Sequence, residues 1–481
     1  MGDIKVSTII FFGAGKLGKY MLDLWEQLGI QPDFFADNSE KNKGSFYCGI
    51  KVLSIEEVKS MENIQILITC NQIDNILNQL LDCGINEKNI FKANTLYHML
   101  IFLTLHMRGK LHWNALQKTS KNLENLSSYS VIFDVQYGFV LGGVESWVLH
   151  TANQLPFQEK EVKFISTDMR ISSKYNLDNR EILLKEWRKL PEKNKLNECL
   201  TVIKMNLPCN IVCNFPDFIF WSACIAKILW PQEVNLIAVV HNDADIYYNQ
   251  YSEMEASIDW CLTISTKIKN SLLRKGFPIE KIRDLNWKIS LNNKLERSYS
   301  KKGHILRLGY AGRVTLEQKR VDLLITISEK LKDLGVEFTL EIAGIGDYLQ
   351  TVRAIIKKYE LENQVKLLGL ISNDKISEFW KCKDIALSCS EFEGRSISQA
   401  EAMAAGAVPV ITDTSGARDY VEDSYNGFIV PVGDVEAMVN RIYYLYYHRE
   451  LVEIMGRRSH EVIIRQNEEN NIEALWNKIL K

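Results

Sequence analysis

The chain has 481 residues, which is too long for one hydrophobic core of ordinary size and predicts about three domains. Lysine and arginine (58) nearly balance aspartate and glutamate (60), so no overall positive field favours nucleic acid as a partner. Hydrophobic residues make up 46% of the chain and charged residues 25%, which predicts a soluble globular protein.

Ten cysteines are scattered through the chain, mostly within apolar runs and without the paired spacing of a metal site. That pattern suits buried thiols in a reducing compartment. The segment MGDIKVSTIIFFGAGKLG lacks the basic start and the cleavage site of a signal peptide, and no apolar run reaches the roughly 18 residues of a spanning helix. We therefore expect a cytoplasmic protein of bacterial type, at most peripheral at the inner face of the membrane.

Residues 1–96 are predicted to form a small Rossmann-like domain, because strand patterns alternate there with helical patterns. The run VSTIIFF at residues 6–12 indicates a buried strand, KYMLDLWEQLG a helix, and PDFFADN and IQILITC two further strands. This alternation is typical of a doubly wound α/β domain.

Three glycines of this domain, Gly13, Gly15 and Gly18, lie between the first strand and the first helix, and Asp37 follows at the end of the second strand. This is the full context of a dinucleotide-binding turn. The domain also resembles the small Rossmann-like domains that precede some bacterial sugar acyltransferases. Two interpretations stay open, namely binding of a nucleotide or nucleotide sugar, and a docking or dimerisation domain that has kept the fold.

Residues 97–128 are predicted to be a helical linker, which is helical in period at first and then basic and polar. The aromatic and basic stretch from Tyr97 to Trp113 has two interpretations. It could rest on a membrane surface, or it could be a buried helix between domains, which we favour.

Two further alternating units follow, at residues 129–297 and 298–481. The first contains the strand patterns NIVCNF and NLIAVVH, and the second contains ILRLGYAGR, FTLEIAG and IALSCS. The predicted fold class is therefore α/β, with two tandem Rossmann-like domains preceded by a small Rossmann-like domain. Such sheets bind ligands at the carboxyl ends of their strands, so a cleft is expected between the two larger domains.

The segment SEFEGRSISQAEAMAAGAVPVITD, residues 390–413, contains a predicted helix after a strand. Ser396 and Gln399 have the spacing of a capping box, and Gly406 is a good helix terminator. A helix over residues 397–405 is therefore predicted, with its free N–H groups at the carboxyl end of the strand.

Two glutamates of this segment and a group of cations are the candidate binding residues. Glu393 is in the loop before the helix and Glu401 is within it, and taken alone both are more often surface acids. Arg313 ends a strand of the same domain, and Lys319 and Arg320 precede an apolar helix. Arginine can fork onto phosphate oxygens and lysine adds a point charge, so these cations at the mouth of the domain favour a ligand site.

The last unit contains an ordered series of motifs, namely Gly312-Arg313, Lys319, EIAGIGDYLQTV, VKLLGLISNDKISEFWKCKDIALSCSEFEG and EAMAAGAVPVITDTSGARDYVEDSYNGFIVPVGD. Together these motifs resemble the carboxyl-terminal domain of the retaining glycosyltransferases of family 4. These enzymes have the two-domain fold called B. The resemblance is dense over residues 303–460 and weaker over residues 129–295, where GGVESWVLHTANQL resembles the amino-terminal glycine turn of the family. In this fold the final helix, here in NNIEALWNKILK, commonly returns to the first catalytic domain.

The resemblance implies a role for each candidate residue. Arg313 and Lys319 would neutralise the diphosphate of a nucleotide-sugar donor, Glu393 would hold sugar hydroxyls and Glu401 would reach the ribose. His241, after the strand NLIAVV, would contact the donor sugar, with a structural histidine as the alternative. Fixed cations stabilise a leaving phosphate best in a dry cleft, so no metal or other cofactor is expected to be required.

Two segments of residues 129–297 carry alternatives. Gly142 and Gly143 lie at a strand-to-helix turn, where backbone N–H groups could approach phosphate or acceptor, and a plain tight turn is the other interpretation. Residues 243–245, Asp-Ala-Asp, match the metal signature of the other large glycosyltransferase fold. We expect no metal there, because Arg313 and Lys319 would do the same electrostatic work.

The sequence departs from the family after the first glutamate. The family often has Gly-Phe-Gly-x-Pro at this place, whereas this chain has Gly394-Arg395-Ser396-Ile397-Ser398. An additional cation and two hydroxyl groups are therefore expected to line the donor-sugar loop. This leaves the donor open, with a UDP-sugar favoured.

The sequence thus predicts a metal-independent, retaining hexosyl- or N-acetylhexosaminyltransferase that acts on a bacterial glycan or lipid-linked glycan in cell-surface polysaccharide assembly. Front-face attack, in which a phosphate oxygen takes the acceptor proton, needs no protein nucleophile, so the glutamates would orient the donor rather than act as a hydrolase pair. Two other classes fit less well. A non-catalytic partner predicts loss of the cations or glutamates, and a nicotinamide-dependent oxidoreductase predicts a Tyr-x-x-x-Lys pattern that we do not find near the first domain.

Overall fold

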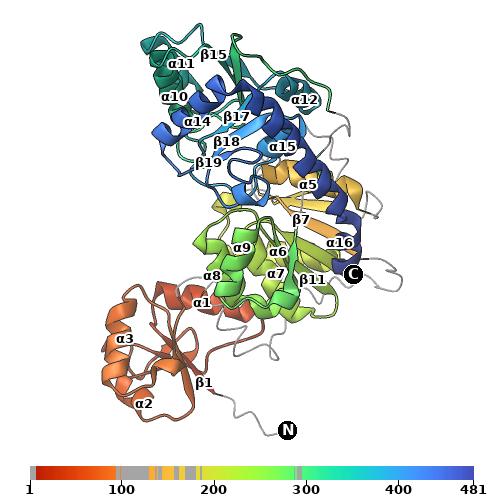
Figure 1. The fold of residues 1–481 in the computed structure, drawn as a ribbon. Helices are drawn as coiled ribbons and strands as arrows, with labels where there is room; N and C mark the ends of the chain where they lie inside the picture. Colours follow the sequence, from red (N-terminus) through yellow and green to blue (C-terminus); the bar gives the residue numbers. More distant parts are fainter. Residues whose placement is uncertain are drawn as a thin grey trace.

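The computed structural model describes residues 7–93, 98, 129–135, 138, 143–155, 162–167, 180–184, 187–285, 288–289 and 295–481. It contains three sheets that lie one after another along the molecule, from the amino-terminal sheet at the bottom of Figure 1 to the third sheet at the top. The predicted α/β class with three Rossmann-like units is confirmed. The predicted linker at 97–128 lies outside the described residues, apart from residue 98.

The first sheet has the strand order β3-β4-β2-β1-β5-β6, and all neighbours are parallel except β3 and β4. Its strands are β1 (Thr8–Phe12), β2 (Phe34–Ala36), β3 (Phe46–Tyr47), β4 (Ile50–Leu53), β5 (Ile64–Ile68) and β6 (Ile90–Lys92). Its helices are α1 (Lys16–Gln27), α2 (Ile55–Lys59) and α3 (Ile73–Asp82). Apolar residues of this domain belong to one continuous cluster with residues of the second domain, so the two domains share packed surface.

The second sheet has the order β13-β12-β11-β10-β7-β8-β9, with all neighbours parallel. Its strands are β7 (Ser130–Asp134), β8 (Val162–Ser166), β9 (Glu181–Leu183), β10 (Cys209–Cys213), β11 (Val234–Val240), β12 (Trp260–Thr263) and β13 (Ile282–Asp284). Its helices are α5 (Gly143–Gln154), α6 (Glu192–Met205), α7 (Phe218–Leu229), α8 (Asp245–Glu253) and α9 (Thr266–Arg274). Every residue of β10 and β11 is buried, because helices cover both faces of a parallel sheet.

The third sheet has the order β16-β15-β14-β17-β18-β19 and is also parallel. Its strands are β14 (Leu306–Ala311), β15 (Phe338–Ala343), β16 (Val365–Gly369), β17 (Ile385–Ser388), β18 (Val408–Thr412) and β19 (Phe428–Val430). The helices of this part are α10 (Val321–Asp333), α11 (Leu349–Lys358), α12 (Asn373–Lys381), α13 (Ile397–Ala404), α14 (Val435–Tyr447), α15 (Arg449–Glu469) and α16 (Ile472–Ile479). Because β14 and β17 are neighbours, the loops that follow them lie side by side.

Helix α16 leaves the third sheet and packs on the second, as the dark blue end of the ribbon in Figure 1 shows. Its Trp476 and Ile479 belong to the same apolar cluster as Phe133 of β7. Asn235 of β11 donates its amide N–H to Ile479 O at 2.7 Å, and Asn210 accepts the N–H of Lys481 at 3.0 Å. Buried asparagines of the second sheet therefore hold the last residues of the chain.

Helix α13 matches the predicted helix closely, and Gly406 beyond it has a φ of 78°, which favours glycine. The predicted capping box is wrong, because the side chain of Ser396 caps no helical N–H group. Gln399 instead points into the core, where its Nε2 donates to Leu387 O of β17 at 3.3 Å. A buried amide must find a partner, and this tertiary bond takes precedence over the local one.

A buried carboxylate, Asp384, anchors the segment that leads into the third sheet. Arg307 Nη2 donates to Asp384 Oδ1 at 2.6 Å, and Ser300 N and Oγ donate to the same carboxylate at 3.0 and 2.6 Å. Arg449 at the start of α15 donates to Ser300 Oγ.

Among the described residues, no helix combines the length and the apolar character needed to span a bilayer.

Replacing Asp384 with asparagine should destabilise the third sheet by about 3 kcal/mol, because it leaves the partly buried Arg307 without its counter-ion. Burial acts to raise the pKa of Asp384, but hydrogen bonds from Arg307 and Ser300 outweigh it and lower the pKa. The stabilisation should therefore be complete above the ordinary aspartate pKa and be lost as the pH falls below about 4. Hydrogen exchange of peptides over β14 and β17 measures this locally. The matched change Asp333→Asn, at an exposed acid, should leave exchange unchanged, and equal exchange in both variants contradicts the assignment.

Candidate active site

The candidate site lies where the carboxyl end of the third sheet meets the carboxyl end of the second. His241 follows β11, and the loop of residues 389–396 follows β17. A Cβ atom on Gly394 would lie less than 3.0 Å from both the carbonyl oxygen of His241 and the side chain of Ile264. Only glycine lets this loop rest directly on the end of β11.

Lys319 and Glu393 form an ion pair within the site. Their side chains are 16% and 12% exposed, and Ser390 Oγ donates to Glu393 Oε1 at 2.9 Å. The two residues are on the loops after β14 and β17, which are adjacent strands. The structure thus brings the predicted cation and the predicted sugar-binding acid together, and each neutralises the other.

Further bonds hold these two loops to each other. Gln318 O accepts the N–H of Glu391 at 2.8 Å, and Gln318 Nε2 donates to Phe392 O at 3.3 Å. Arg320 forms ion pairs with Asp322 at 3.2 Å and with Glu391 at 3.1 Å. The third predicted cation is therefore committed to two carboxylates and braces the loops instead of facing a ligand.

Arg313 lies at the exposed rim of the site, where Tyr310 Oη donates to its carbonyl oxygen at 2.7 Å. Its Nη2 donates to the amide oxygen of Gln318, and no carboxylate pairs with it among the described residues. A guanidinium has five N–H donors, so most of them remain open to a ligand. A Cβ atom on Gly344 would overlap Gly312 O, so the β14 and β15 loops are in backbone contact beside Arg313.

Glu401 lies on α13, half-buried, and burial raises the pKa of its carboxyl group to about 7. In the described part of the chain its carboxyl group forms no hydrogen bond or ion pair. A carboxyl group in that state can both donate and accept at neutral pH, which suits contact with hydroxyl groups.

His241 is 8% exposed, and burial lowers its pKa to about 3, so the ring is neutral. Its Nε2 lies 2.8 Å from Asn214 Oδ1, while Asn214 Nδ2 donates to Asp134 O at 2.6 Å. The amide of Asn214 can therefore only accept from the ring, which assigns the proton to His241 Nε2. Nδ1 keeps its lone pair, and Trp147 packs edge-on at a ring distance of 5.0 Å. Nδ1 can therefore accept a hydrogen bond from a hydroxyl group.

Glu145 was missed by the sequence analysis. It lies in the first turn of α5, is 7% exposed, and burial raises the pKa of its carboxyl group. Its own N–H and the positive charge of Arg313 offset part of that rise, so the acid on the second domain is electrostatically linked to the cation on the third. An acid immediately after the predicted glycine turn was the signal that could have found it.

The predicted glycine turn is only partly described. Gly142 lies outside the described residues, and Gly143 is the first residue of α5. A Cβ atom on Gly143 would lie 3.7 Å from Ile397 Cδ1, which is ordinary contact. The start of α5 therefore faces the start of α13, and the described geometry does not itself demand glycine at Gly143.

Arg395 and the two serines after it are positioned as follows. The guanidinium of Arg395 bonds Gln466 of α15 and lies 5.8 Å from the ring centre of Tyr420, and burial lowers its pKa. Ser396 precedes α13, and the hydroxyl of Ser398 is buried without a hydrogen bond among the described residues. Arg395 thus ties the loop to α15, which differs from the expectation that it lines the sugar site.

Hydrogen bonds within the first domain occupy both carboxylate oxygens of Asp37 at the predicted nucleotide-binding turn. Asp37 Oδ2 accepts the N–H of Ala14 at 2.8 Å, and Asp37 Oδ1 accepts the N–H of Ser39 at 2.7 Å. A Cβ atom on Gly18 would overlap Gly13 O, so glycine is required for the turn to pack on α1. A Cβ atom on Gly15 would meet nothing within 4 Å. Asp37 therefore stabilises the turn.

The possible metal signature at residues 243–245 has partners within the chain. Asp243 accepts from Tyr248 Oη at 2.6 Å and pairs with Lys267 at 2.9 Å, and Asp245 begins α8. No group of three or more potential metal ligands occurs among the residues that the structure describes.

The change Glu401→Gln tests the burial of this acid through the pH dependence of stability. Between the ordinary glutamate pKa and about 7, the folded chain holds a proton that the unfolded chain has lost, so wild-type stability should fall as the pH rises to about 7. The amide carries no such penalty. The melting temperature of the variant relative to wild type should therefore rise from pH 5 to pH 8 by differential scanning fluorimetry, whereas exposed Glu362→Gln should follow wild type. A constant difference across this range contradicts the burial of Glu401.

Two family models match separate parts of the chain. Residues 293–462 match the family described as Glycosyl transferases group 1, and residues 5–91 match the one described as C2185-like, N-terminal.

The similar curated proteins are glycosyltransferases by name. The putative colanic acid biosynthesis glycosyltransferase WcaL of Salmonella typhimurium is 29% identical over 202 residues, which cover 41% of this chain and 50% of WcaL. The poly(ribitol-phosphate) alpha-N-acetylglucosaminyltransferase of Staphylococcus aureus is 28% identical over 206 residues, 42% of this chain and 39% of that protein. The chain spans half or less of the length of these curated relatives.

Solved structures share the fold of the second and third domains. HepE of Anabaena in complex with UDP-glucose has a TM-score of 0.59 at 15% identity, over 73% of this chain and 100% of HepE. The lipopolysaccharide outer core galactosyltransferase WaaB has a TM-score of 0.55 at 18% identity, over 73% of this chain and 99% of WaaB. Residues 293–462 are therefore a domain of the glycosyl transferases group 1 family, within the two-domain glycosyltransferase fold B.

Proposed function

We propose that the chain is a retaining glycosyltransferase that moves a sugar from a nucleotide-sugar donor, a UDP-sugar, to a glycan or lipid-linked glycan in cell-surface polysaccharide assembly. The observation that carries the proposal is the pairing of Lys319 and Glu393 at the carboxyl edge of the third sheet, with Arg313 open beside them. The relatives support it, because they are named for colanic acid, amylovoran and poly(ribitol-phosphate) glycosyltransferases. Solved neighbours contain UDP or UDP-glucose.

The ion pair suggests how a donor is taken up. A diphosphate attracts the ammonium group of Lys319 more strongly than a single carboxylate does, because it carries more charge and more acceptor oxygens. As Lys319 turns to the diphosphate, Glu393 becomes free to accept hydroxyl groups of the donor sugar. Arg313 adds a second cation, and together they stabilise the charge that develops on the leaving phosphate.

The remaining residues then orient the donor. His241 Nδ1, unprotonated, accepts a hydroxyl of the sugar, and Glu401 accepts from the ribose. The acceptor hydroxyl attacks on the face from which the phosphate leaves, and a phosphate oxygen takes its proton. In this scheme Arg313 and Lys319 perform the charge neutralisation that a divalent metal would otherwise supply, so the reaction is metal-independent.

Some expectations stay predictions. Nucleotide binding by the first domain would require a ribose to share Asp37 with the two backbone N–H groups it already accepts. The docking interpretation gains some support, because the apolar cluster of the first domain continues into the second. Cytoplasmic location and peripheral membrane contact also stay predictions.

The donor site is tested by incubating the full chain with a panel of UDP-, GDP- and other nucleotide sugars and measuring nucleotide release. Lys319→Ala and Glu393→Ala should each lower release by about 100-fold or more, because each removes a group that stabilises charge or holds the sugar in the transition state. The exposed changes Lys357→Ala and Glu362→Ala should leave release unchanged. No release with any donor, or equal release in all four variants, contradicts the proposed function.

Glu145→Gln tests whether the buried acid of the second domain binds the acceptor. A hydrogen bond to a charged group contributes about 1.5–3 kcal/mol, so kcat/KM for the acceptor should fall by about tenfold or more. Binding of UDP, measured by calorimetry, should stay within about threefold of wild type, because Glu145 is on the acceptor side. Exposed Glu233→Gln is the control. A loss of UDP affinity equal to the loss of transfer would assign Glu145 to the donor instead.

A further inference from the structure

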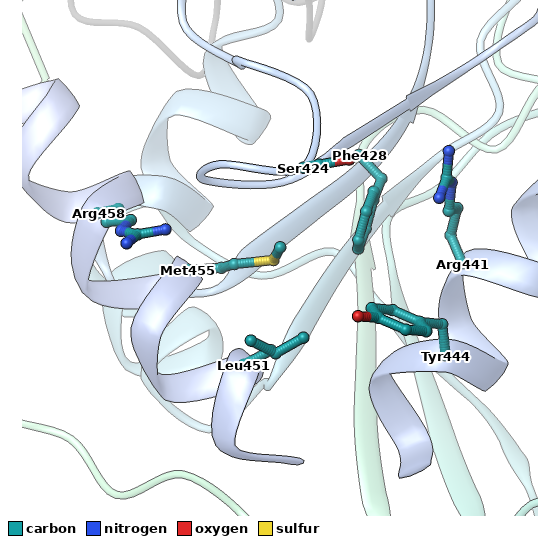
Figure 2. Close-up of a pocket in the computed structure, with 7 residues that line it drawn as sticks. All are labelled: Ser424, Phe428, Arg441, Tyr444, Leu451, Met455 and Arg458. Atoms are coloured by element: carbon teal, nitrogen blue, oxygen red, sulfur yellow. The ribbon is translucent and has the colours of Figure 1, made fainter. Parts of the chain in front are cut away.

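A cavity of about 240 Å³ lies in the third domain between α14, α15 and the start of β19. Its lining residues are Ser424, Phe428, Arg441, Tyr444, Leu451, Met455 and Arg458. Figure 2 shows Tyr444 on one side and Leu451 and Met455 on the other pointing toward the same space, with Arg441 and Arg458 on opposite sides. Phe428 is the first residue of a parallel strand, so the cavity lies at the opposite edge of the sheet from the candidate active site.

The cavity carries two positive charges and no acid. Arg441 is held 4.8 Å over the ring of Phe428, and Arg458 is held 4.3 Å over the ring of Tyr425. Arg458 also donates to Tyr425 O at 3.2 Å. Neither guanidinium forms an ion pair with a carboxylate in the described part of the chain. Two arginines fixed by aromatic rings, with open N–H donors and no counter-ion, favour an anionic ligand.

The charged neighbours of the cavity have other partners. Asp423, next to Ser424, accepts from Ile429 N at 2.9 Å and from Ser424 Oγ at 3.1 Å. Arg457, next to Arg458, pairs with Glu453 at 2.8 Å. Arg457 of α15 thus forms an ion pair with a carboxylate, whereas Arg458 beside it forms none among the described residues.

Apolar side chains form most of the rest of the cavity lining, and exposed apolar residues lie near it. Met455 is 4% exposed and Phe428 is 1% exposed, whereas Tyr447 on α14 and Ile454 on α15 are 49% and 42% exposed. Tyr447 lies three residues after Tyr444, so helical spacing places it next to the cavity rim. The volume is below the roughly 300–1,000 Å³ of sites that enclose a drug-sized ligand, so only the head of a larger molecule fits inside.

We propose that this cavity binds the phosphate head of an amphiphilic phosphate ester. The phosphate pairs with a guanidinium at one side of the cavity, Arg441 or Arg458, and the first carbons of the chain contact Leu451, Met455 and the ring of Tyr444. The rest of the chain lies over the exposed apolar residues at the rim. The site is separate from the candidate active site and does not depend on the proposed glycosyl transfer. Its ligand could be a soluble phosphate ester or an anionic membrane lipid, which share this chemistry.

Calorimetric titration of the full chain with hexyl phosphate tests the proposal. Hexyl phosphate should bind about tenfold or more tightly than inorganic phosphate, because each buried methylene adds to the affinity, and hexanol should not bind measurably. The double variant Arg441→Gln/Arg458→Gln should weaken binding by about tenfold or more. Arg457→Gln, the neighbouring arginine outside the cavity, should bind as wild type does. Each single variant, Arg441→Gln and Arg458→Gln, should show an intermediate loss and a wild-type melting temperature, which guards against misfolding of the double variant.

Two further arms place the probe and identify its source. Lys319→Ala should leave hexyl phosphate binding unchanged, and loss of binding in this variant would place the probe in the other site and overturn the proposal. Equal affinity for hexyl phosphate and inorganic phosphate, or equal binding by the double variant and Arg457→Gln, would also overturn it. Sedimentation with vesicles of equal parts phosphatidylcholine and phosphatidic acid, lost in the double variant, supports a membrane source. Hexyl phosphate binding without sedimentation supports a soluble ester.

Discussion

The backbone contact between Gly394 and the end of β11 is the constraint on which the candidate site depends. No side chain fits at this position, so the loop that carries Glu393 can lie directly on His241 O. Gly416 packs on Gly394 O in the same way, since a Cβ atom there would also lie less than 3.0 Å from that oxygen. Contact between two backbones fixes their relative position more tightly than contact between flexible side chains. Residues from two separate sheets are thereby held in one site.

In the proposed function, the charges of the site exchange partners when a ligand binds. Lys319 and Glu393 neutralise each other where they are partly buried, which limits the cost of desolvating either one. Arg320, in contrast, has two carboxylate partners and keeps the loops together. Under the proposed function a ligand engages Glu393, the partner of Lys319, whereas the partners of Arg320 are structural. Three neighbouring cations therefore need not share one role.

The fold could largely be predicted from the sequence, whereas the pairing within the site could not. A run such as VNLIAVV in β11 predicts a buried parallel strand because it has no polar alternation. The Ser396–Gln399 pattern failed because Gln399 is buried and bonds β17, which a local pattern does not reveal. The pairing of Lys319 with Glu393 depends on β14 and β17 being neighbours, although β15 and β16 lie between them in the chain. Arg395 was assigned to the sugar loop from its position alone, and its bond to α15 depends on how that helix crosses the domain.

The docking of α16 on the second sheet means that the chain passes between the two larger domains twice. It passes once before the third sheet and once after α15, and the two passages meet where Asn467 bonds both the N–H of Ile289, at 3.0 Å, and its carbonyl oxygen, at 2.7 Å. Two covalent crossings joined at one place resist sliding and separation of the domains, but they leave rotation about that place inexpensive. The cleft should therefore open by rotation of the two larger domains about a pivot near Asn467. Arg395 bonds Gln466, the residue before Asn467, so the loop of Gly394 lies beside that pivot.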